Sequence, residues 1–142
     1  MSPRDDSATA RAILERGGTW AVVGCSPDPR RDSNRVARFL QSRGCRVIPV
    51  NPAADEEVLG EPCYPDLASI PASVGIDVVD VFRRSDQAGA HVDEAIEIGA
   101  HAAWMQLGVV DEEAAERGRA AGLQVVMNRC PMIDHPRFFG SG

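Results

Sequence analysis

The loop after the first apolar run carries the residues best suited to chemistry. Gly24, Cys25 and Ser26 follow the strand-like run 20–23, and a helical pattern resumes after residues 32–34. A strand-loop-helix unit directs unpaired backbone N–H groups and the positive end of a helix dipole at one point, which suits a phosphate. Four arginines, whose guanidinium groups pair well with phosphates, accompany this loop: Arg30, Arg31, Arg35 and Arg38.

The loop departs from the usual dinucleotide-binding pattern. A G-x-G-x-x-G fingerprint needs three glycines, and residues 24–29 supply only Gly24. The second predicted strand, residues 46–50, ends in Asn51 and Pro52 and lacks the carboxylate that holds the ribose hydroxyls of NAD. Together with the arginines, these departures favour a nucleotide with an extra ribose phosphate over plain NAD.

Cysteines and histidines show no metal-binding or catalytic spacing. Four cysteines, none of them in a C-x-x-C pair, lie at Cys25, Cys45, Cys63 and Cys130. The three histidines are scattered, and neither a nucleophile-base pair nor a G-x-x-x-x-G-K loop occurs. We therefore expect no catalytic residue, no metal site and no structural disulfide.

Composition limits the class of protein. The 142 residues are 44% hydrophobic and 25% charged, which suits one domain with a hydrophobic core. A net charge of -6 argues against a nucleic-acid partner, because such partners are bound through an excess of basic residues. No signal segment or bilayer-length apolar run is evident, so we expect a cytoplasmic protein with no membrane partner.

Apolar patterns divide the chain into alternating elements. Strands are expected at 20–23, 46–50, 76–82, 102–107 and 123–127, and helices at 5–16, 34–43, 86–98 and 112–121. Strict alternation of this kind predicts an α/β fold: a single doubly wound domain with a mainly parallel five-stranded sheet. The first helix should pack on the sheet, and one helical turn is expected near residues 66–70.

Three local features are predicted less directly. Asp32 to Asn34 are expected to cap the second helix, and Ser85 or Asp86 the third. Pro49 should mark a strand end or irregular pairing, because proline has no N–H donor. In the first helix, Ala8, Ala12 and Ile13 recur at helical spacing.

Parallel strands end at one edge of a sheet, and open α/β sheets bind ligands there. The residues that follow the five predicted strands are 24–26, 51–52, 82–84, 106–108 and 128–130. We therefore expect these residues to border one crevice.

Five segments around this edge together resemble the small stand-alone CoA-binding proteins. They read VVGCSPDPRRDSNRVARFL, VIPVNP, VVDVFRRS, AAWMQLGVV and VVMNRCPMIDHPR. That family is similar to the CoA-binding domain at the start of the succinyl-CoA synthetase alpha subunit, which has a Rossmann-like fold. The resemblance covers nearly the whole chain. It implies one Rossmann-like domain over residues 1–142, with residues 1–17 as a lead-in helix, and CoA or acyl-CoA as the ligand.

The resemblance also implies roles for the phosphate loop. Gly24, Cys25 and Ser26 would approach the CoA pyrophosphate, and Arg35 would help to neutralise its charge. Three further arginines are candidates for the ribose 3'-phosphate: Arg30, Arg31 and Arg84.

The remaining implied contacts follow the other strands. Asn51 and Pro52 would flank the adenosine, while Phe82, Arg83 and Gln106 would border the nucleotide and the pantetheine arm. Phe82 has an ordinary alternative role, which is to close the core.

Other residues at this edge also have ordinary alternatives. Ser26 could stabilise the turn before Pro27, and the loop arginines could simply be solvated. Cys25 and Cys130 fall at the ligand edge, where an inert buried cysteine is favoured and a mixed disulfide with the CoA thiol is the alternative. Position 128 is asparagine in this chain, whereas aspartate is commoner there in the family. An asparagine side chain has no carboxylate, so no general base is expected at this position.

The leading hypothesis is a cytoplasmic CoA or acyl-CoA binding protein without catalytic machinery of its own. One alternative is an NAD(P)-dependent oxidoreductase, which the missing glycines and carboxylate disfavour. Another is the CoA-holding subunit of a two-chain acyl-CoA synthetase, and a third is an interaction domain with no CoA affinity. The acyl group, the oligomeric state and any protein partner stay open.

Overall fold

A computed structural model describes residues 6–53 and 56–140. The α-helices and strands of this part are α1 (Ser7–Arg16), β1 (Thr19–Val23), α2 (Asp32–Ser42), β2 (Arg46–Val50), β3 (Val78–Val81), α3 (Ser85–Glu97), β4 (Ala102–Met105), α4 (Glu112–Ala120), β5 (Gln124–Val126) and α5 (Pro131–Phe139). Short 3-10 helices at Leu67–Ser69 and Ala72–Val74 precede β3. The α/β prediction is confirmed, although the expected helix start at residue 5 lies outside the described residues.

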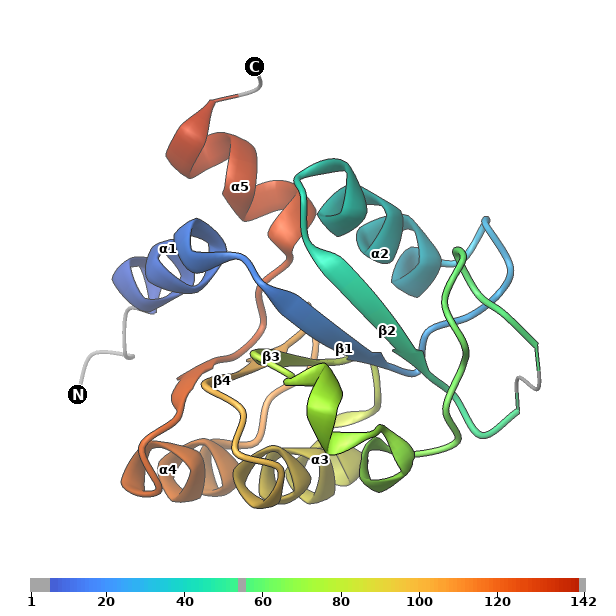
Figure 1. Ribbon diagram of the computed structural model, residues 1–142. Coiled ribbons are helices and arrows are strands. Elements are labelled where there is room, and N and C mark those ends of the chain that lie inside the picture. Colours follow the sequence, from blue (N-terminus) through green and yellow to red (C-terminus); the bar gives the residue numbers. More distant parts are fainter. Residues whose placement is uncertain (1–5, 54–55, 141–142) are drawn as a thin grey trace.

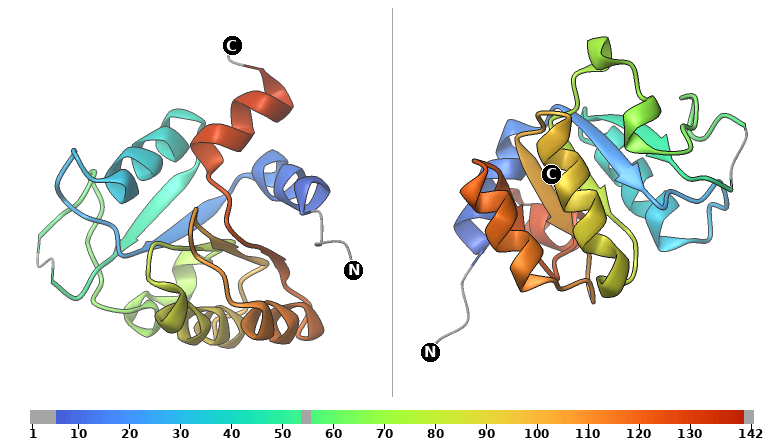
Figure 2. Two further views of the ribbon diagram at one scale, coloured as in Figure 1. Left: turned by 180° about the vertical axis from the view of Figure 1, so that it is seen from behind. Right: turned by 90° about the horizontal axis from the view of Figure 1, so that it is seen from below.

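The sheet is parallel throughout, with strand order β2-β1-β3-β4-β5. Helices α1, α2 and α5 cover one face, and α3 and α4 cover the other (Figures 1 and 2). The strand order reverses between β1 and β3, which is where doubly wound sheets open a crevice at the strands' carboxyl ends. The predicted doubly wound, five-stranded sheet is therefore confirmed.

Two hydrophobic clusters, one on each face, hold the helices to the sheet. Under α1, α2 and α5, the rings of Trp20 and Trp104 lie 5.7 Å apart between their centroids. On the opposite face small residues allow close approach: a Cβ added at Gly118 of α4 would lie 2.9 Å from Val125. Because both faces are covered, the strands read as continuous apolar runs. No helix in the described part of the chain is long and apolar enough to span a membrane.

Pro49 does not disturb the pairing of β2, contrary to the sequence expectation. It lies in register with Val22 of β1, within a regular parallel ladder. Strand β2 is at the edge of the sheet, and the Pro49 carbonyl accepts a 3.0 Å hydrogen bond from the Tyr64 N–H on the outer side. The missing N–H also faces outward, since the N–H and C=O of one strand residue point to the same side, so no ladder bond is lost.

The side-chain caps predicted for two helices are wrong. Helix α2 begins at Asp32 and has no side-chain cap, because Ser33 and Asn34 bond to the preceding loop. Helix α3 begins at Ser85, whose hydroxyl accepts a 2.9 Å bond from the Val110 N–H across the sheet edge. In both places, a polar side chain that looks like a cap in the sequence holds a neighbouring loop instead.

The first helix packs on the sheet as expected, and Ile13 is the buried member of the three residues noted at helical spacing. Its buried residues are Ala10, Ile13 and Leu14, while Ala8 and Ala12 are exposed. The helix lies beside α5 and β5, at the side of the sheet away from β2 (Figure 1).

Candidate functional site

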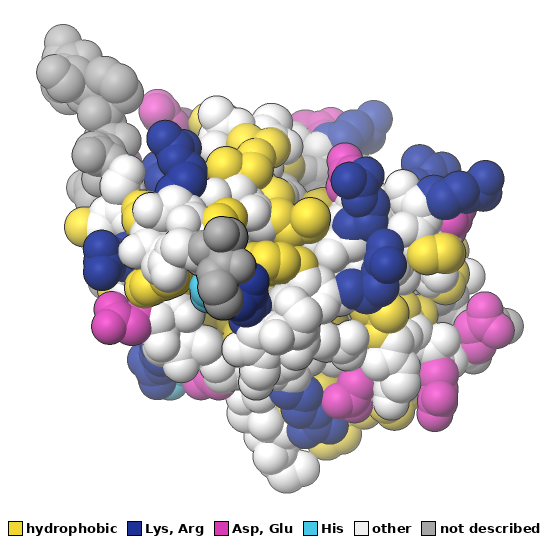
Figure 3. All heavy atoms as spheres, turned by 90° about the horizontal axis from the view of Figure 1, so that it is seen from above, with side chains coloured by type: hydrophobic (Ala, Val, Ile, Leu, Met, Phe, Trp, Pro, Cys, Tyr) yellow, Lys and Arg dark blue, Asp and Glu magenta, His cyan; other side chains and the backbone are white. Residues whose placement is uncertain are grey.

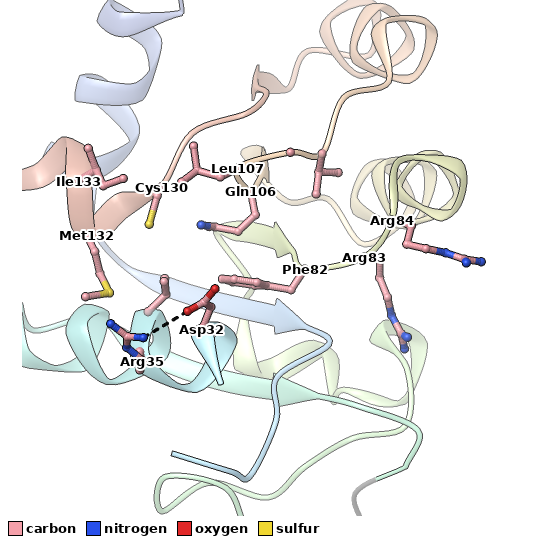
Figure 4. Close-up of a pocket in the computed structure, with 13 residues that line it drawn as sticks. Asp32, Arg35, Phe82, Arg83, Arg84, Gln106, Leu107, Cys130, Met132 and Ile133 are labelled. Atoms are coloured by element: carbon pink, nitrogen blue, oxygen red, sulfur yellow. Dashed lines mark hydrogen bonds and ion pairs between the residues drawn. The ribbon is translucent and has the colours of Figure 1, made fainter. Parts of the chain in front are cut away.

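Two cavities open at the carboxyl edge of the sheet and share Asp32 and Phe82 as lining residues. The polar cavity, of about 550 Å³, is lined by Gly24, Ser26, Arg30, Arg31, Asp32, Ser33 and Phe82. The apolar cavity, of about 520 Å³, is lined by Asp32, Arg35, Val36, Phe82, Arg83, Arg84, Gln106, Leu107, Gly108, Val109, Cys130, Met132 and Ile133 (Figure 4). The two cavities are therefore direct neighbours at this edge.

The phosphate loop is fastened to the first turn of α2. The Ser33 hydroxyl accepts a 3.0 Å bond from the Ser26 N–H, and the Asn34 amide donates a 2.9 Å bond to the Ser26 carbonyl. The Ser26 hydroxyl in turn accepts a bond from the Asp28 N–H, 3.0 Å long. Ser26 therefore stabilises its own turn, as the alternative interpretation had it, while still lining the polar cavity.

The backbone N–H groups of this loop are already paired. Partners within the loop, α2 or β2 accept bonds from the N–H groups of Gly24, Cys25, Ser26, Asp28, Arg30 and Arg31. Within the predicted strand-loop-helix unit, the unpaired N–H groups are therefore not in the loop. The first turn of α2, which no side chain caps, and the neighbouring arginines are the groups that suit an anion here.

Gly24 allows the loops after β1 and β3 to meet. Its φ of +86° lies in the left-handed region, and an added Cβ would lie 2.6 Å from the Phe82 carbonyl oxygen. Only glycine fits this close approach. Phe82 is thereby held, half-buried, on the wall between the cavities, so it does not simply close the core.

Three of the arginines that line the cavities, Arg30, Arg35 and Arg84, are paired with carboxylates. Arg30 binds both carboxylate oxygens of Asp28, at 3.1 and 3.0 Å, and this contact lowers the pKa of Asp28. Arg35 lies 3.4 Å from Asp32, and both side chains are well exposed. An anionic ligand would have to compete with these carboxylates for the guanidinium groups.

Arg83 and Arg84 lie at the far side of Phe82 from Cys130 (Figure 4). Arg84 pairs with Asp86 at 3.5 Å in an exposed contact. Arg84 lines the apolar cavity, so the structure separates it from the other two candidates for the 3'-phosphate, which line the polar cavity. The Nε of Arg83 is buried without a hydrogen-bond partner among the described residues.

Gln106 is the most deeply buried polar side chain of the apolar cavity. The residue is 5% exposed, and its Oε1 has no hydrogen-bond partner in the described part of the chain. Its backbone is fixed by bonds to the Val81 carbonyl and from the Val109 N–H. Since an unpaired buried acceptor costs about 1–3 kcal/mol, a ligand N–H at this point would remove a penalty that the free protein carries.

Cys25, Asn51 and Pro52 line neither cavity. The Asn51 amide donates a 3.0 Å bond to the Cys25 carbonyl, so it supports the phosphate loop from behind. Cys25 is fully buried; burial, with Cys63 and Asp80 nearby, raises its thiol pKa to about 12. The thiol therefore stays protonated and unreactive, which agrees with the favoured interpretation of a buried cysteine.

Asp80 is a buried carboxyl in the central strand β3. It pairs in register with Val22 and Trp104 and is completely buried. Neither of its oxygens has a hydrogen-bond partner within residues 6–53 and 56–140, and burial raises its pKa well above the usual value. Burial thus favours the uncharged carboxyl beneath the site, which would not repel an anionic ligand.

Sequence reasoning missed several residues of the site. Ser33 was expected as a helix cap, and Met132 and Ile133 of α5 were not considered, although all three line a cavity. Pro131, at the first position of α5, is the signal that could have marked this helix. Asn128 adopts a left-handed conformation and accepts a 2.7 Å bond from the Gly108 N–H, so it positions a loop.

The surface above the site is divided by chemical character. On the face that carries α2 and α5, basic side chains gather over α2 and the adjoining loop (Figure 3). Hydrophobic atoms lie between this basic group and α5. The arrangement suits a ligand that is anionic at one end and mainly apolar at the other.

Comparison with known proteins identifies related chains. A family described as "CoA binding domain" matches residues 18–136. The uncharacterized protein YneT of Bacillus subtilis is 39% identical over 128 residues, which cover 90% of this chain and 93% of YneT. A hypothetical protein from Pyrococcus horikoshii OT3 has the same fold, with a TM-score of 0.87 and 39% identity over 99% of this chain and all of that one.

A larger enzyme is also similar. The ADP-forming acetate–CoA ligase I of Archaeoglobus fulgidus is 29% identical over 121 residues, which cover 78% of this chain. The chain spans only 17% of that ligase.

Proposed function

The chain belongs to the CoA-binding domain family, and on this premise we propose that it binds CoA or an acyl-CoA in the cytoplasm, without catalytic machinery of its own. A reducing compartment suits a chain with four free cysteines. The observation that carries the proposal is the pair of cavities that share Asp32 and Phe82. The polar cavity is bordered by Arg30, Arg31 and the N-terminus of α2. The other cavity is bordered by apolar side chains, by Arg35, Arg83 and Arg84, and by the buried Gln106.

The two ends of CoA suit these two cavities. The uncapped first turn of α2 and Arg35 suit the pyrophosphate, while Arg30 and Arg31 suit the 3'-phosphate. The pantetheine arm is largely aliphatic and contains two amides, so it suits the apolar wall beside Phe82 and the unpaired oxygen of Gln106. The adenosine would lie toward the end of β2, where the phosphate loop meets Asn51 and Pro52.

Titration calorimetry with CoA, 3'-dephospho-CoA and NAD tests the proposal. CoA should bind, dephospho-CoA should bind more weakly because it lacks the phosphate that Arg30 and Arg31 would hold, and NAD should bind weakest. Preferential NAD binding would favour an oxidoreductase. No heat with CoA or several acyl-CoAs would contradict the proposal and favour an interaction domain.

A second candidate function is that of the CoA-holding subunit of a two-chain acyl-CoA synthetase. The similarity to part of a CoA ligase supports it. It predicts that a second chain copurifies with this one and that the mixture consumes ATP in the presence of CoA and a carboxylic acid. If the native protein purifies alone and CoA still binds, the binding-protein proposal stands without it.

A further inference from the structure

The thiol of Cys130 lines the apolar cavity at the start of α5, as does the buried side chain of Gln106, whose Oε1 has no hydrogen-bond partner among the described residues. We propose that Cys130 is a modification site at which the pantetheine thiol of CoA is attached through a reversible mixed disulfide. This inference rests on the proposed CoA binding and adds to it a covalent, redox-dependent mode of retention.

The backbone around Cys130 is held firmly. The indole N–H of Trp104 donates a 2.9 Å bond to the Arg129 carbonyl, and the Asp134 N–H donates a 2.9 Å bond to the Cys130 carbonyl. Arg129 also binds the buried carboxylate of Asp134 at 2.7 Å. The thiol is therefore presented from a fixed point, which favours reaction with a ligand that is itself held in place.

Gln106 is an independent indication that a ligand ends near this thiol. It is 5% exposed, its Oε1 has no partner among the described residues, and it lines the same cavity as Cys130. Figure 4 shows the Gln106 side chain directed toward the space beside Cys130, with its amide nitrogen at that end. An amide group at this point suits a ligand amide, which offers both a donor and an acceptor, and in pantetheine an amide nitrogen lies two carbons from the thiol.

The packing of α5 brings Cys130 close to the phosphate end of the site. Helix α5, which begins just after Cys130, packs against α2, and Cys130 lines the same cavity as Asp32 and Arg35. A CoA whose pyrophosphate lies at α2 would therefore have its pantetheine arm in the cavity that contains Cys130.

The other three cysteines do not line the apolar cavity. Cys25 is fully buried, and burial raises its thiol pKa to about 12. Cys45 precedes β2 and lines a different cavity, at the amino edge of the sheet, and burial raises its thiol pKa. Cys63 lies beside the Asn51 carbonyl and lines neither cavity of the site. Cys130 alone of the four lines the apolar cavity, at the start of α5, and the residue is 8% exposed there.

The reaction is a thiol-disulfide exchange with CoA disulfide as co-reactant. The Cys130 sulfur, as thiolate, attacks one sulfur of CoA disulfide; the S–S bond of that reagent breaks as the new S–S bond to Cys130 forms. The second CoA leaves as a thiolate and takes up the proton that Cys130 lost. One cysteine and one CoA sulfur become joined while the other CoA sulfur is reduced, so no further oxidant is required.

The rim of the apolar cavity leaves room for the departing half of the reagent. Leu107 is 54% exposed and Ile133 is 46% exposed. These two side chains flank Cys130 (Figure 4). One half of CoA disulfide can occupy the site while the other extends into solvent over this apolar rim.

Mass spectrometry under non-reducing conditions tests the proposal. The reduced protein, freed of reductant and incubated with CoA disulfide, should gain one CoA, and dithiothreitol should remove it. Peptide mapping of the unaltered protein should locate the adduct at Cys130. Cys130→Ser should remain unmodified, whereas the matched control Cys45→Ser should be modified as the wild type is. Glutathione disulfide should react at least about tenfold more slowly, because only CoA disulfide is positioned by the site.

The outcomes separate this inference from the proposed function. An adduct mapped to Cys45, or equal rates with both disulfides, would overturn the inference, since either shows general thiol reactivity. If reduced CoA binds in calorimetry with reductant present but no adduct forms, the modification site is wrong and the proposed function stands. If CoA neither binds nor forms an adduct, both are wrong.

Discussion

The polar and apolar cavities share a wall but are built in opposite ways. In the polar cavity, the loop N–H groups are already bonded, and Arg30 is already paired with Asp28. In the apolar cavity, Gln106 Oε1 and Arg83 Nε are buried without partners among the described residues. The polar cavity is therefore shaped by bonds that it makes without ligand, whereas the apolar cavity contains polar atoms that a ligand would satisfy.

This difference indicates where affinity and selectivity should arise. In the polar cavity, a phosphate contact of Arg30 replaces its existing ion pair with Asp28, so the net gain should be modest. A hydrogen bond to Gln106 replaces no protein contact and removes a desolvation penalty. We therefore expect the arm of CoA to contribute more per contact than its phosphates, and the predictions below test that order.

The largest effect is expected at the junction of the cavities. Gly24→Ala should lower the free energy of unfolding by about 3 kcal/mol, because its Cβ meets the Phe82 carbonyl in a left-handed conformation. Gly44→Ala is the matched control: its φ is +89°, nothing lies within 4 Å of the added Cβ, and it should cost about 1 kcal/mol. Urea unfolding followed by circular dichroism measures both. Equal losses would show that the close approach does not shape the site.

Gln106→Met should change stability and binding in opposite directions. Removing the unpaired buried amide should raise the free energy of unfolding by about 1 kcal/mol, while CoA affinity should fall by about tenfold. Calorimetry and thermal unfolding of the same preparation measure the two quantities, with Gln87→Met on the exposed side of α3 as control. Unchanged CoA affinity would remove Gln106 from the ligand path.

Arg35→Ala should weaken CoA binding by about 1 kcal/mol through loss of a charge-assisted contact. The loss should be equal for 3'-dephospho-CoA, because both ligands carry the pyrophosphate. Arg38→Ala is the control on the same helix, since Arg38 donates to the Pro29 carbonyl and lines neither cavity. A loss confined to CoA would instead assign Arg35 to the 3'-phosphate.

The smallest effect is expected from Asp32→Asn. Asp32 lines both cavities, pairs with Arg35 and has an 85% exposed side chain. Removing its charge frees the guanidinium for the ligand, and CoA affinity should rise by about twofold at low salt and less at high salt. Weaker binding at every salt concentration would mean that Asp32 contacts the ligand directly.

The fold was predictable because its signals are long and repeated. Five apolar runs alternate with helical patterns, and the loop, turn and glycine positions between them agree with that division. Pro49 and the caps of α2 and α3 were not predictable, because each depends on its place in the assembled sheet. An edge position makes the proline harmless, and contacts across the edge draw Ser33 and Ser85 away from capping.

The sequence predicted which edge of the sheet carries the candidate site, but it did not predict the hydrogen bonds and helix contacts within that site. Gly24, Ser26, Phe82 and Gln106 were identified because they follow strands, and all four line the cavities. The pairing of the loop N–H groups was missed, since the acceptors come from α2 and β2. The contribution of α5 was missed as well, because its pattern is short and contains Pro136.

We expect one CoA molecule to occupy both cavities. Amide NMR spectra recorded during titration with CoA and, separately, with adenosine 3',5'-bisphosphate test it most directly. CoA should shift the signals of Ser33 and Arg31 together with the side-chain amide of Gln106, whereas the bisphosphate should shift the first two and leave Gln106 unchanged. If CoA binds and the signal of the Gln106 amide does not move, the arm of CoA does not enter the apolar cavity.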